Sequence, residues 1–376
     1  INKDIDFEDT KIYKNIFAKG KTASVFQFAS KGMQDALRKV NASNMDDLIA
    51  VVALYRPGPL EYIDTYAQGK KNPDAIHYED PIIKKHLEVT YSIMVYQEQG
   101  MLLARDMAGF DHNEVDKLRK AISKKNDKLF AEVTDLFRKK SLERGFSEKA
   151  VDSVLNLMSK FVGYAFNKSH ACSYAILAFW TAWFRYYYPH EWLATCIDLA
   201  KDDEDKVAIL RKDCDLEGIA IREADLNESG LATLVNSKNE IMLPLSSVKG
   251  VGSSAKDIVL NQPYEDCKDL CFRARPNRKT VESLAENGAL VCLKDSNKFS
   301  YLEDFMIYWD ELVALRTEED KRIAREARKK FTPAISLNET LHLDDADAII
   351  EKNRPKQRTP RKRGNIQSLL TDELFD

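Results

Sequence analysis

The sequence is poor in the residues that mark extracellular, membrane-spanning or fibrous chains. Its 376 residues include only 14 glycines, 11 prolines and 6 cysteines. The cysteines stand at positions 172, 196, 214, 267, 271 and 292, without the spacing of a disulfide framework, so we expect reduced thiols in a cytoplasmic protein. Cys267 and Cys271 are four residues apart, which fits one helix face, and no second cysteine pair lies near them to complete a zinc site.

An excess of charge of one sign is also missing. The formal net charge is −3, so no overall field attracts nucleic acid, and any such binding must come from local basic patches. The chain is long enough for two or three units. Its 44% apolar and 31% charged residues are typical of a soluble globular protein.

No apolar run is well suited to a membrane span. The most aromatic stretch, residues 171–188, holds eight aromatic residues, but Arg185 interrupts it. A run of this length barely spans a bilayer, and a guanidinium is costly in lipid. We therefore predict a buried helix of a soluble protein, apolar on all sides, and no membrane partner.

Several catalytic patterns are absent. The sequence has no phosphate-binding P-loop, no nucleophilic triad and no set of carboxylates that would converge on two metal ions. The acidic runs at 202–206 and 343–347 indicate solvent-exposed faces or helix starts. We therefore predict no catalytic residue and no metal ligand in this chain. Ile1 is not an initiator methionine and no signal-peptide pattern follows it, so we expect a fragment or a processed product.

Hydrophobic periodicity predicts a mainly α protein. Two helices are expected within residues 31–55, ended by YRPGPL at 55–60, where two prolines forbid a helix and Gly58 permits a sharp turn. Further expectations are a loop over 60–80, helices over 81–200 with breaks near Gly109, Gly145 and Gly163, a charged helix and turns over 201–240, a strand-like IMLPL at 241–245, and two short helices up to about residue 292.

The C-terminal part differs in composition. Residues 316–330 indicate a solvated charged helix. Residues 352–363 carry seven basic side chains, two prolines and no acid, which favours disorder. The chain ends in the short peptide NIQSLLTDELFD.

Residues 110–130, treated as one helix, place two stripes on opposite sides. The apolar stripe is Val115, Leu118, Ile122 and Leu129, and the basic stripe is Lys117, Lys120, Lys124 and Lys128, with Lys125 as a further cation. The basic stripe is either a solvated face or a surface for a polyanion. Arg119 falls at the edge of the apolar stripe, where it must extend to water or bind a partner, and its planar fork suits a triphosphate.

The segment NKSH, residues 167–170, precedes the aromatic run. In a helix Asn167, His170 and Tyr174 share one face, and Lys168 stands at the positive N-terminal end. This set suits phosphates, with Tyr174 packing on a sugar or a base. The alternative is that Asn167 or Ser169 caps the aromatic helix.

The segment VKGVGSSA, residues 248–255, has the pattern of a helix-hairpin-helix turn. Gly250 and Gly252 let the turn approach a DNA backbone, and backbone N–H groups from Ser253 onward can bind a phosphate without reading sequence. Lys249 and Lys256 flank the turn and add attraction. The alternative is a plain turn between two helices.

The order of these motifs resembles that of the bacterial DNA polymerase III alpha subunit, a family C replicative polymerase, over roughly residues 1–292. The motifs that carry the resemblance are VFQF-x-SKGM (25–33), DLIAVVALYRPGPL (47–60), VYQEQGMLLARDMAGF (95–110), DKLRKAISKK (116–125), YAFNKSHACSYAI (164–176) and IMLPLSSVKGVG (241–252).

The resemblance implies a multi-helical fingers domain followed by a small helix-hairpin-helix domain and a partly disordered tail. The implied divisions are a palm-to-fingers connection over 1–30, the helical fingers domain over 31–225, the DNA- and clamp-side domain over 226–300, and a charged helix, basic linker and end peptide over 301–376. The PHP domain, the palm with its catalytic aspartates and the late OB domain of that family have no counterpart in the sequence.

The resemblance also implies roles for particular residues. Arg119 and Lys120, followed by Lys124, match the family's basic pair and would bind the triphosphate of the incoming nucleotide, with Lys125 on the DNA side. The family's FNKSH segment falls on Phe166 to His170, with Tyr174 after it, facing the nucleotide. Two departures stand out: Lys120 replaces an arginine and Ser123 a glycine, which puts the bidentate grip and the local backbone freedom in question.

By the same resemblance the activity is template-directed DNA synthesis, in which a nucleotidyl group passes from a dNTP to a primer 3′-hydroxyl. The Mg²⁺ ions would be held by a palm outside this chain, so the chain alone should bind DNA weakly and turn over nothing. Partners would be primer-template DNA, dNTP and a palm-containing portion, in a bacterial or phage cytoplasm.

A sliding clamp is a further partner that the resemblance raises. The family carries a clamp-binding peptide of the form Gln-x-x-Leu-Phe. Here Leu374 and Phe375 keep its end but the glutamine is missing, and Gln367 with Leu370 is a partial alternative. Two other readings stay open: a non-catalytic DNA- or clamp-binding factor derived from such a polymerase, and a helical scaffold with no nucleotide role.

Overall fold

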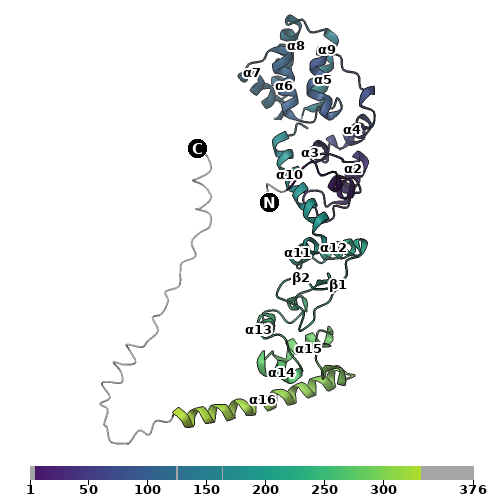
Figure 1. The fold of residues 1–376 in the computed structure, drawn as a ribbon. Coiled ribbons are helices and arrows are strands. Elements are labelled where there is room, and N and C mark those ends of the chain that lie inside the picture. The colour runs from purple at the N-terminus through teal and green to yellow at the C-terminus, as the bar shows by residue number, and fades with distance from the viewer. Residues whose placement is uncertain (1–4, 124–125, 163, 332–376) are drawn as a thin grey trace, which may run out of the picture. The chain divides into compact units, whose positions relative to one another are not determined.

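The computed structural model describes residues 5–123, 126–162 and 164–331, and these are mainly helical (Figure 1). The predicted fold class is therefore confirmed. The chain divides into two units, residues 1–313 and 314–376. The basic linker and the end peptide lie outside the described residues, so their predicted disorder and clamp binding stay predictions.

The described part of residues 5–200 is built mainly from helices. They are α1 (Thr10–Ile12), η1 (Tyr13–Phe17), α2 (Lys31–Val40), α3 (Met45–Leu54), η2 (Pro59–Glu61), α4 (Tyr62–Lys71), η3 (Pro73–Ala75), α5 (Pro81–Leu87), η4 (Glu88–Thr90), α6 (Gln97–Ala108), α7 (His112–Ser123), α8 (Asp127–Glu143), α9 (Glu148–Phe161), α10 (Lys168–Tyr187) and α11 (Pro189–Leu199).

The remaining elements include a small sheet. They are α12 (Glu204–Glu217), β1 (Ile221–Arg222), β2 (Leu234–Val235), β3 (Ile241–Met242), η5 (Leu245–Ser247), α13 (Ser254–Leu260), α14 (Cys267–Arg273), α15 (Arg278–Glu286), η6 (Ser296–Lys298) and α16 (Leu302–Phe331). Strand β3 lies in the middle of the sheet: Ile221 of β1 pairs in parallel with Ile241, and Val235 of β2 pairs with it antiparallel.

The first hydrophobic core lies around α3 and α10. Helix α3 is buried from Asp47 to its end because the residues from Leu48 to Leu54 are all apolar. Helix α10 turns a stripe of small residues toward this core: Ala171, Ala175, Ala178 and Ala182 are fully buried, together with Phe179. The prediction that α10 is buried on all sides is wrong, because most of its aromatic rings are only half-buried and Tyr187 and Tyr188 are exposed.

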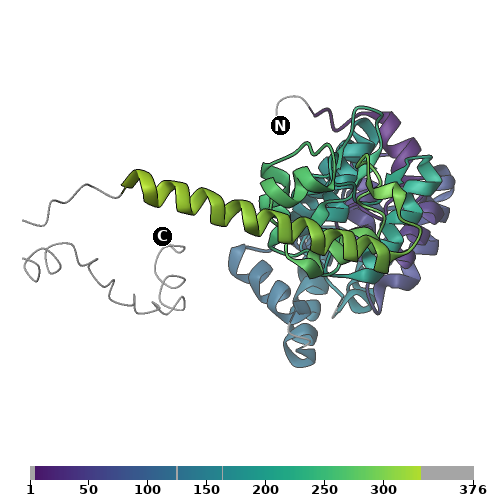
Figure 2. The ribbon, with the colours of Figure 1, turned by 90° about the horizontal axis from the view of Figure 1, so that it is seen from below.

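Three further cores follow along the chain. Helices α5 to α9 enclose one, and α11, α12 and the sheet enclose a small one. Helices α13 to α15 and the first turns of α16 enclose the last, with Trp309 fully buried. Helix α16 comprises Leu302–Phe331 (Figure 2), and its residues 314–331 belong to the second unit.

Three local predictions are wrong. Residues 62–71 form α4 rather than a loop, because Ile63 and Tyr66 are buried there and Lys70 pairs with buried Asp47. Residues up to 292 hold three short helices, not two. The expected single helix over 110–130 is two helices, because Asn126 caps α8 by accepting from the Leu129 N–H at 3.1 Å.

Other local predictions are confirmed. Helix α3 ends at Leu54, before YRPGPL, and Gly109 ends α6 in a left-handed conformation. Cys267 and Cys271 are both buried on α14. Asp203 caps α12, so the acidic run at 202–206 is a helix start.

None of the helices that the structure describes has both the length and the apolar character of a membrane span.

Arg185 ties α10 to α12. Its side chain is 1% exposed, and its guanidinium donates to Asp213 at 2.9 Å, to Glu217 at 3.3 Å and to the Lys21 carbonyl at 3.1 Å. Lys21 completes the group by pairing with Glu217 at 2.9 Å. The arginine that interrupts the aromatic run therefore has a structural role, because it joins the two helices through a buried ion pair.

The lowered pKa of the Asp106 carboxyl makes the stability of the fold depend on pH. Burial raises the pKa of this carboxyl, but hydrogen bonds from Arg105, His86 and Lys85 outweigh this and hold the pKa well below its usual value. A lowered pKa in the folded state gives stability above about pH 4 that is lost as the pH falls through the folded value. We expect Asp106→Asn to lower stability at pH 7 and to reduce its loss at pH 3, measured by urea unfolding. Asp64→Asn, which removes an exposed pair with Lys39, should change neither; equal effects of the two changes would contradict this reasoning.

Candidate functional site

The NKSH segment forms the start of α10. Asn167 caps the helix by accepting from the His170 N–H at 2.8 Å, so the capping alternative holds for Asn167 and not for Ser169. The next N–H, that of Lys168, donates to both carboxylate oxygens of Glu98, at 3.1 and 3.0 Å. A carboxylate thus occupies the positive end of α10, where an anion is most stable.

The first turn of α6 lies directly beside this helix start. Tyr96 and Phe166 form a parallel bridge, and the Gln97 N–H donates to the Phe166 carbonyl at 2.9 Å. The ammonium of Lys168 lies 5.4 Å from the centre of the Tyr96 ring, within the range of a cation–π contact. Tyr96 and Glu98 together fix where Lys168 stands.

Helix α7, which carries Arg119 and Lys120, packs beside α6. Helices α6 and α7 are joined by the short loop at Gly109 and pack on each other. The last turn of α7 therefore lies along the first turn of α6, and a Cβ on Gly100 would come within 4.0 Å of the Ile122 side chain. Arg119 and Lys120 both bind Asp116, at 2.7 and 2.8 Å, and lower its pKa.

The predicted stripe of lysines over residues 110–130 is wrong. Because α7 ends at Ser123, Lys128 stands on another helix, α8, and does not continue a stripe from Lys117 and Lys120. Lys124 and Lys125 lie outside the described residues. Of the two alternatives for Arg119, the structure shows a partner, because its guanidinium pairs with Asp116.

A row of rings runs along the exposed side of α10. The Phe166 and His170 rings are 5.6 Å apart, His170 and Tyr174 are 4.3 Å apart, and Tyr174 lies 5.3 Å from Phe26. The guanidinium of Arg56 lies 4.5 Å from the centre of the Phe166 ring and closes the other end. His170 and Tyr174 thus share a face, as predicted, while Asn167 is used in the cap.

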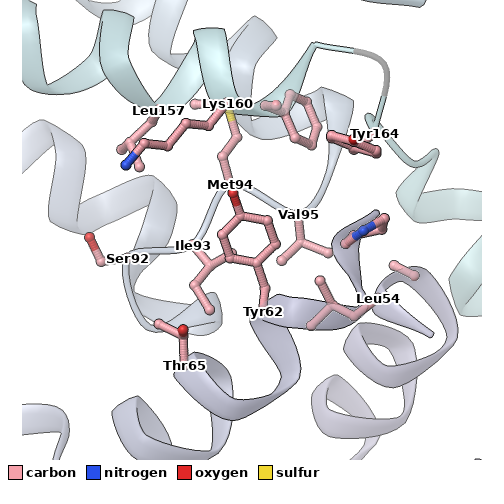
Figure 3. Close-up of a pocket in the computed structure, with 13 residues that line it drawn as sticks. Leu54, Tyr62, Thr65, Ser92, Ile93, Met94, Val95, Leu157, Lys160 and Tyr164 are labelled. Carbon is pink, nitrogen blue, oxygen red and sulfur yellow. The ribbon is translucent and has the colours of Figure 1, made fainter. Parts of the chain in front are cut away.

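A cavity of about 160 Å³ lies between the α3–α4 region and the end of α9 (Figure 3). Leu54, Tyr62 and Thr65 of the α3–α4 region line one side, and Leu157, Lys160 and Tyr164 line the other. Gly58 has a φ of +101°, and a Cβ there would lie 2.0 Å from the Tyr164 ring. The YRPGPL turn therefore lets the Tyr164 ring pack against the backbone of Gly58. Arg56 of the same turn donates to the Tyr164 carbonyl, so the turn also holds the segment just before NKSH.

The second candidate site is the turn before α13. Gly250 and Gly252 have φ of +100° and +47°, and a Cβ on Gly250 would lie 2.6 Å from the Ser283 hydroxyl of α15. Val248, Val251 and Ala255 are buried in the last core. Five predicted contact residues are exposed: Lys249, Gly250, Gly252, Ser253 and Lys256. Within the described part of the chain, the N–H groups of Gly252 and Ser253 have no hydrogen-bond acceptor.

No metal centre accompanies either site. Among residues 5–123, 126–162 and 164–331 no group of three or more histidine, cysteine, aspartate or glutamate side chains could hold a metal ion. These residues do not fit Mg²⁺, so no chemical step through a metal can be derived for them. Leu374 and Phe375 lie outside the described residues.

Some contact residues were missed from the sequence. Glu98 and Tyr96, which hold Lys168, lie in the VYQEQ motif, and Phe26 and Arg56 lie in the VFQF and YRPGPL motifs. These motifs signalled the family but not the contacts, because each contact joins segments up to 148 residues apart, from Phe26 to Tyr174.

Comparison with protein families gives two matches. Residues 2–145 match the bacterial DNA polymerase III alpha subunit finger domain, and residues 218–300 match a helix-hairpin-helix motif. Both matches agree with the resemblance inferred from the motifs.

Among individual proteins, the chain is similar to several DNA polymerase III alpha subunits. It is 36% identical to that of Aquifex aeolicus over 305 residues, which is 78% of this chain and 26% of the relative. It is 35% identical to that of Xylella fastidiosa over 294 residues, 76% of this chain and 25% of the relative. It is 33% identical to that of Chlamydia trachomatis over 370 residues, 96% of this chain and 29% of the relative. The chain thus spans about a quarter of the length of these relatives.

Proposed function

The chain carries the fingers domain and the helix-hairpin-helix region of the bacterial DNA polymerase III alpha subunit, and from this premise we propose that it binds the incoming dNTP and primer-template DNA for template-directed DNA synthesis. Arg119, Lys120 and Lys168 face the triphosphate, with His170 and Tyr174 beside it. The predicted roles of Lys124 and Lys125 form part of the same proposal. The metal ions and the catalytic carboxylates belong to a palm outside this chain.

One observation carries this proposal. The end of α7, which carries Arg119 and Lys120, packs on α6, and the Lys168 N–H at the start of α10 donates to Glu98 in the first turn of α6. Two cationic segments that are far apart in sequence therefore both lie against α6. Asp116 pairs with the side chains of Arg119 and Lys120, and Glu98 accepts from the backbone N–H of Lys168. A triphosphate, with its higher charge, would compete with Asp116 for the two cations.

The experiment for this function is primer extension. The purified chain should not extend a primed template with dNTP and Mg²⁺, and extension should appear when a palm-containing portion of the same polymerase is added. Extension by the chain alone would contradict the assignment of catalysis to another portion. A failure of the chain to contribute to the reconstituted activity would leave it as a DNA-binding factor.

The hairpin turn gives a separate proposal for DNA. The free N–H groups of Gly252 and Ser253 bind a backbone phosphate, and Lys249 and Lys256 add charge on either side. We expect Lys249→Ala and Lys256→Ala each to weaken binding to duplex DNA of any sequence and to reduce the slope of log K against log salt by about 1. Fluorescence anisotropy at several salt concentrations measures this. The matched control is Lys238→Ala, an exposed lysine in the 236–240 turn, which should leave the slope unchanged; a slope unchanged in all three variants would refute the role of the turn.

A further inference from the structure

The ring row on α10 ends at a residue with no assigned role. Phe26 packs one side against Tyr174, with 5.3 Å between ring centres, and yet 40% of its surface is exposed. Phe26 is thus a partly exposed aromatic residue at the end of a row of tilted rings. It continues the row of His170 and Tyr174 away from Arg56.

The loop that carries Phe26 is held in an uncommon shape. The Phe26 N–H donates to the Thr181 hydroxyl at 3.0 Å, and the Trp192 indole N–H donates to the Ser24 hydroxyl at 3.0 Å. Gln27 has a φ of +65°, a left-handed conformation that costs free energy for a residue other than glycine. Such a conformation persists where the surroundings impose it, and here they fix the direction in which Phe26 points.

We propose that Phe26 stacks on the nucleobase of the bound nucleotide, as the last member of the row Phe26, Tyr174, His170 and Phe166. This inference rests on the proposed function and assigns one part of the nucleotide to each end of the site. The cationic end, with Lys168 beside Tyr96, takes the triphosphate. The aromatic end takes the base.

A nucleobase fits this row better than other flat or apolar ligands. Neighbouring rings stand 4.3 to 5.6 Å apart between centres and are tilted by 42 to 53°, which keeps them in mutual contact as one aromatic surface. Base stacking on such a platform tolerates every base, because each base has a π face. A polymerase that accepts four nucleotides needs a base contact of this kind, and the triphosphate, which all four nucleotides share, binds at the cationic end.

The test compares two probes on the full 376-residue chain. One is the triphosphate of 2-aminopurine deoxyribonucleoside, whose fluorescence falls when the base stacks; the other is inorganic triphosphate, which has no base. We expect Phe26→Ala to weaken binding of the first roughly tenfold and to abolish its quenching, since stacking of a base contributes about 1–3 kcal/mol, while binding of inorganic triphosphate stays unchanged. Phe26→Trp should retain both binding and quenching.

The controls separate this inference from the proposed function. Tyr301→Ala removes another exposed aromatic ring, 69% exposed, outside the row, and should change neither probe. Arg119→Ala should weaken both probes. If Phe26→Ala binds and quenches 2-aminopurine triphosphate like the unchanged chain while Arg119→Ala does not, the inference is wrong and the function stands. If the unchanged chain binds neither probe, both are wrong.

Discussion

Replacing Arg185 by alanine is expected to lower the free energy of unfolding by about 3–5 kcal/mol, because removing one partner of a buried ion pair leaves the other charge without compensation. Asp213 is 8% exposed and accepts from Arg185 at 2.9 Å. Burial raises the pKa of Asp213, and Arg185 is the main group that opposes this. Without the guanidinium, Asp213 must stay charged and unpaired or take up a proton. Urea unfolding followed by circular dichroism measures the change.

Arg211→Ala is the matched control for this prediction. Arg211 lies on α12, like Asp213, and pairs with Glu223 at 3.0 Å, but both side chains are exposed, at 40% and 69%. Exposed pairs contribute about 0–1 kcal/mol. An Arg185→Ala variant no less stable than Arg211→Ala would show that the α10–α12 contact does not depend on the buried pair.

Arg119→Ala is expected to weaken binding of dNTP by about 10- to 150-fold, which corresponds to the 1.5–3 kcal/mol of a hydrogen bond to a charged group. In the reconstituted polymerase kcat/KM should fall by a similar factor. Arg119 can offer a planar fork to two oxygens of a phosphate, which Lys120 cannot. Lys120→Ala should therefore weaken dNTP binding less than Arg119→Ala does.

Arg138→Ala is the control that matches Arg119→Ala most closely. Arg138 lies on the neighbouring α8, is 44% exposed and pairs with Asp152 at 2.5 Å, whereas Arg119 is 40% exposed and pairs with Asp116 at 2.7 Å. Both variants lose one surface ion pair of the same kind. A difference between them in nucleotide binding therefore reports a contact with the nucleotide and not the loss of the pair.

Much of the helical fold could be predicted because local signals are strong. YRPGPL ends α3, Gly109 ends α6, and Asp203 begins α12 through capping and turn chemistry that is confined to a few residues. The helix-hairpin-helix turn likewise follows from its two glycines and the buried residues Val248 and Val251, three positions apart.

The remaining features depend on contacts between distant segments. Helix α4 has a weak periodicity of its own and forms because Lys70 reaches Asp47 and because Tyr66 packs beneath α3. The aromatic residues of α10 suggested a buried surface, but its alanines make the close contact with α3. The periodicity of a single helix does not predict which of its faces a neighbouring helix will cover.

The candidate site shows the same division. The family resemblance pointed to Arg119, Lys168 and His170, whereas Glu98, Tyr96 and Asp116, which hold two of them in place, became visible only in the fold. The extended lysine stripe was wrong for a local reason, since a single capping residue, Asn126, divides the helix.

Titration of the unchanged chain, Arg119→Ala and Arg138→Ala with dATP tests most directly whether α7 and α10 together form one wall of a nucleotide site. We predict that Arg138→Ala binds like the unchanged chain and that Arg119→Ala binds at least tenfold more weakly. Equal dATP affinity in all three proteins would contradict the account, because the cationic end of α7 would then have no part in binding the nucleotide.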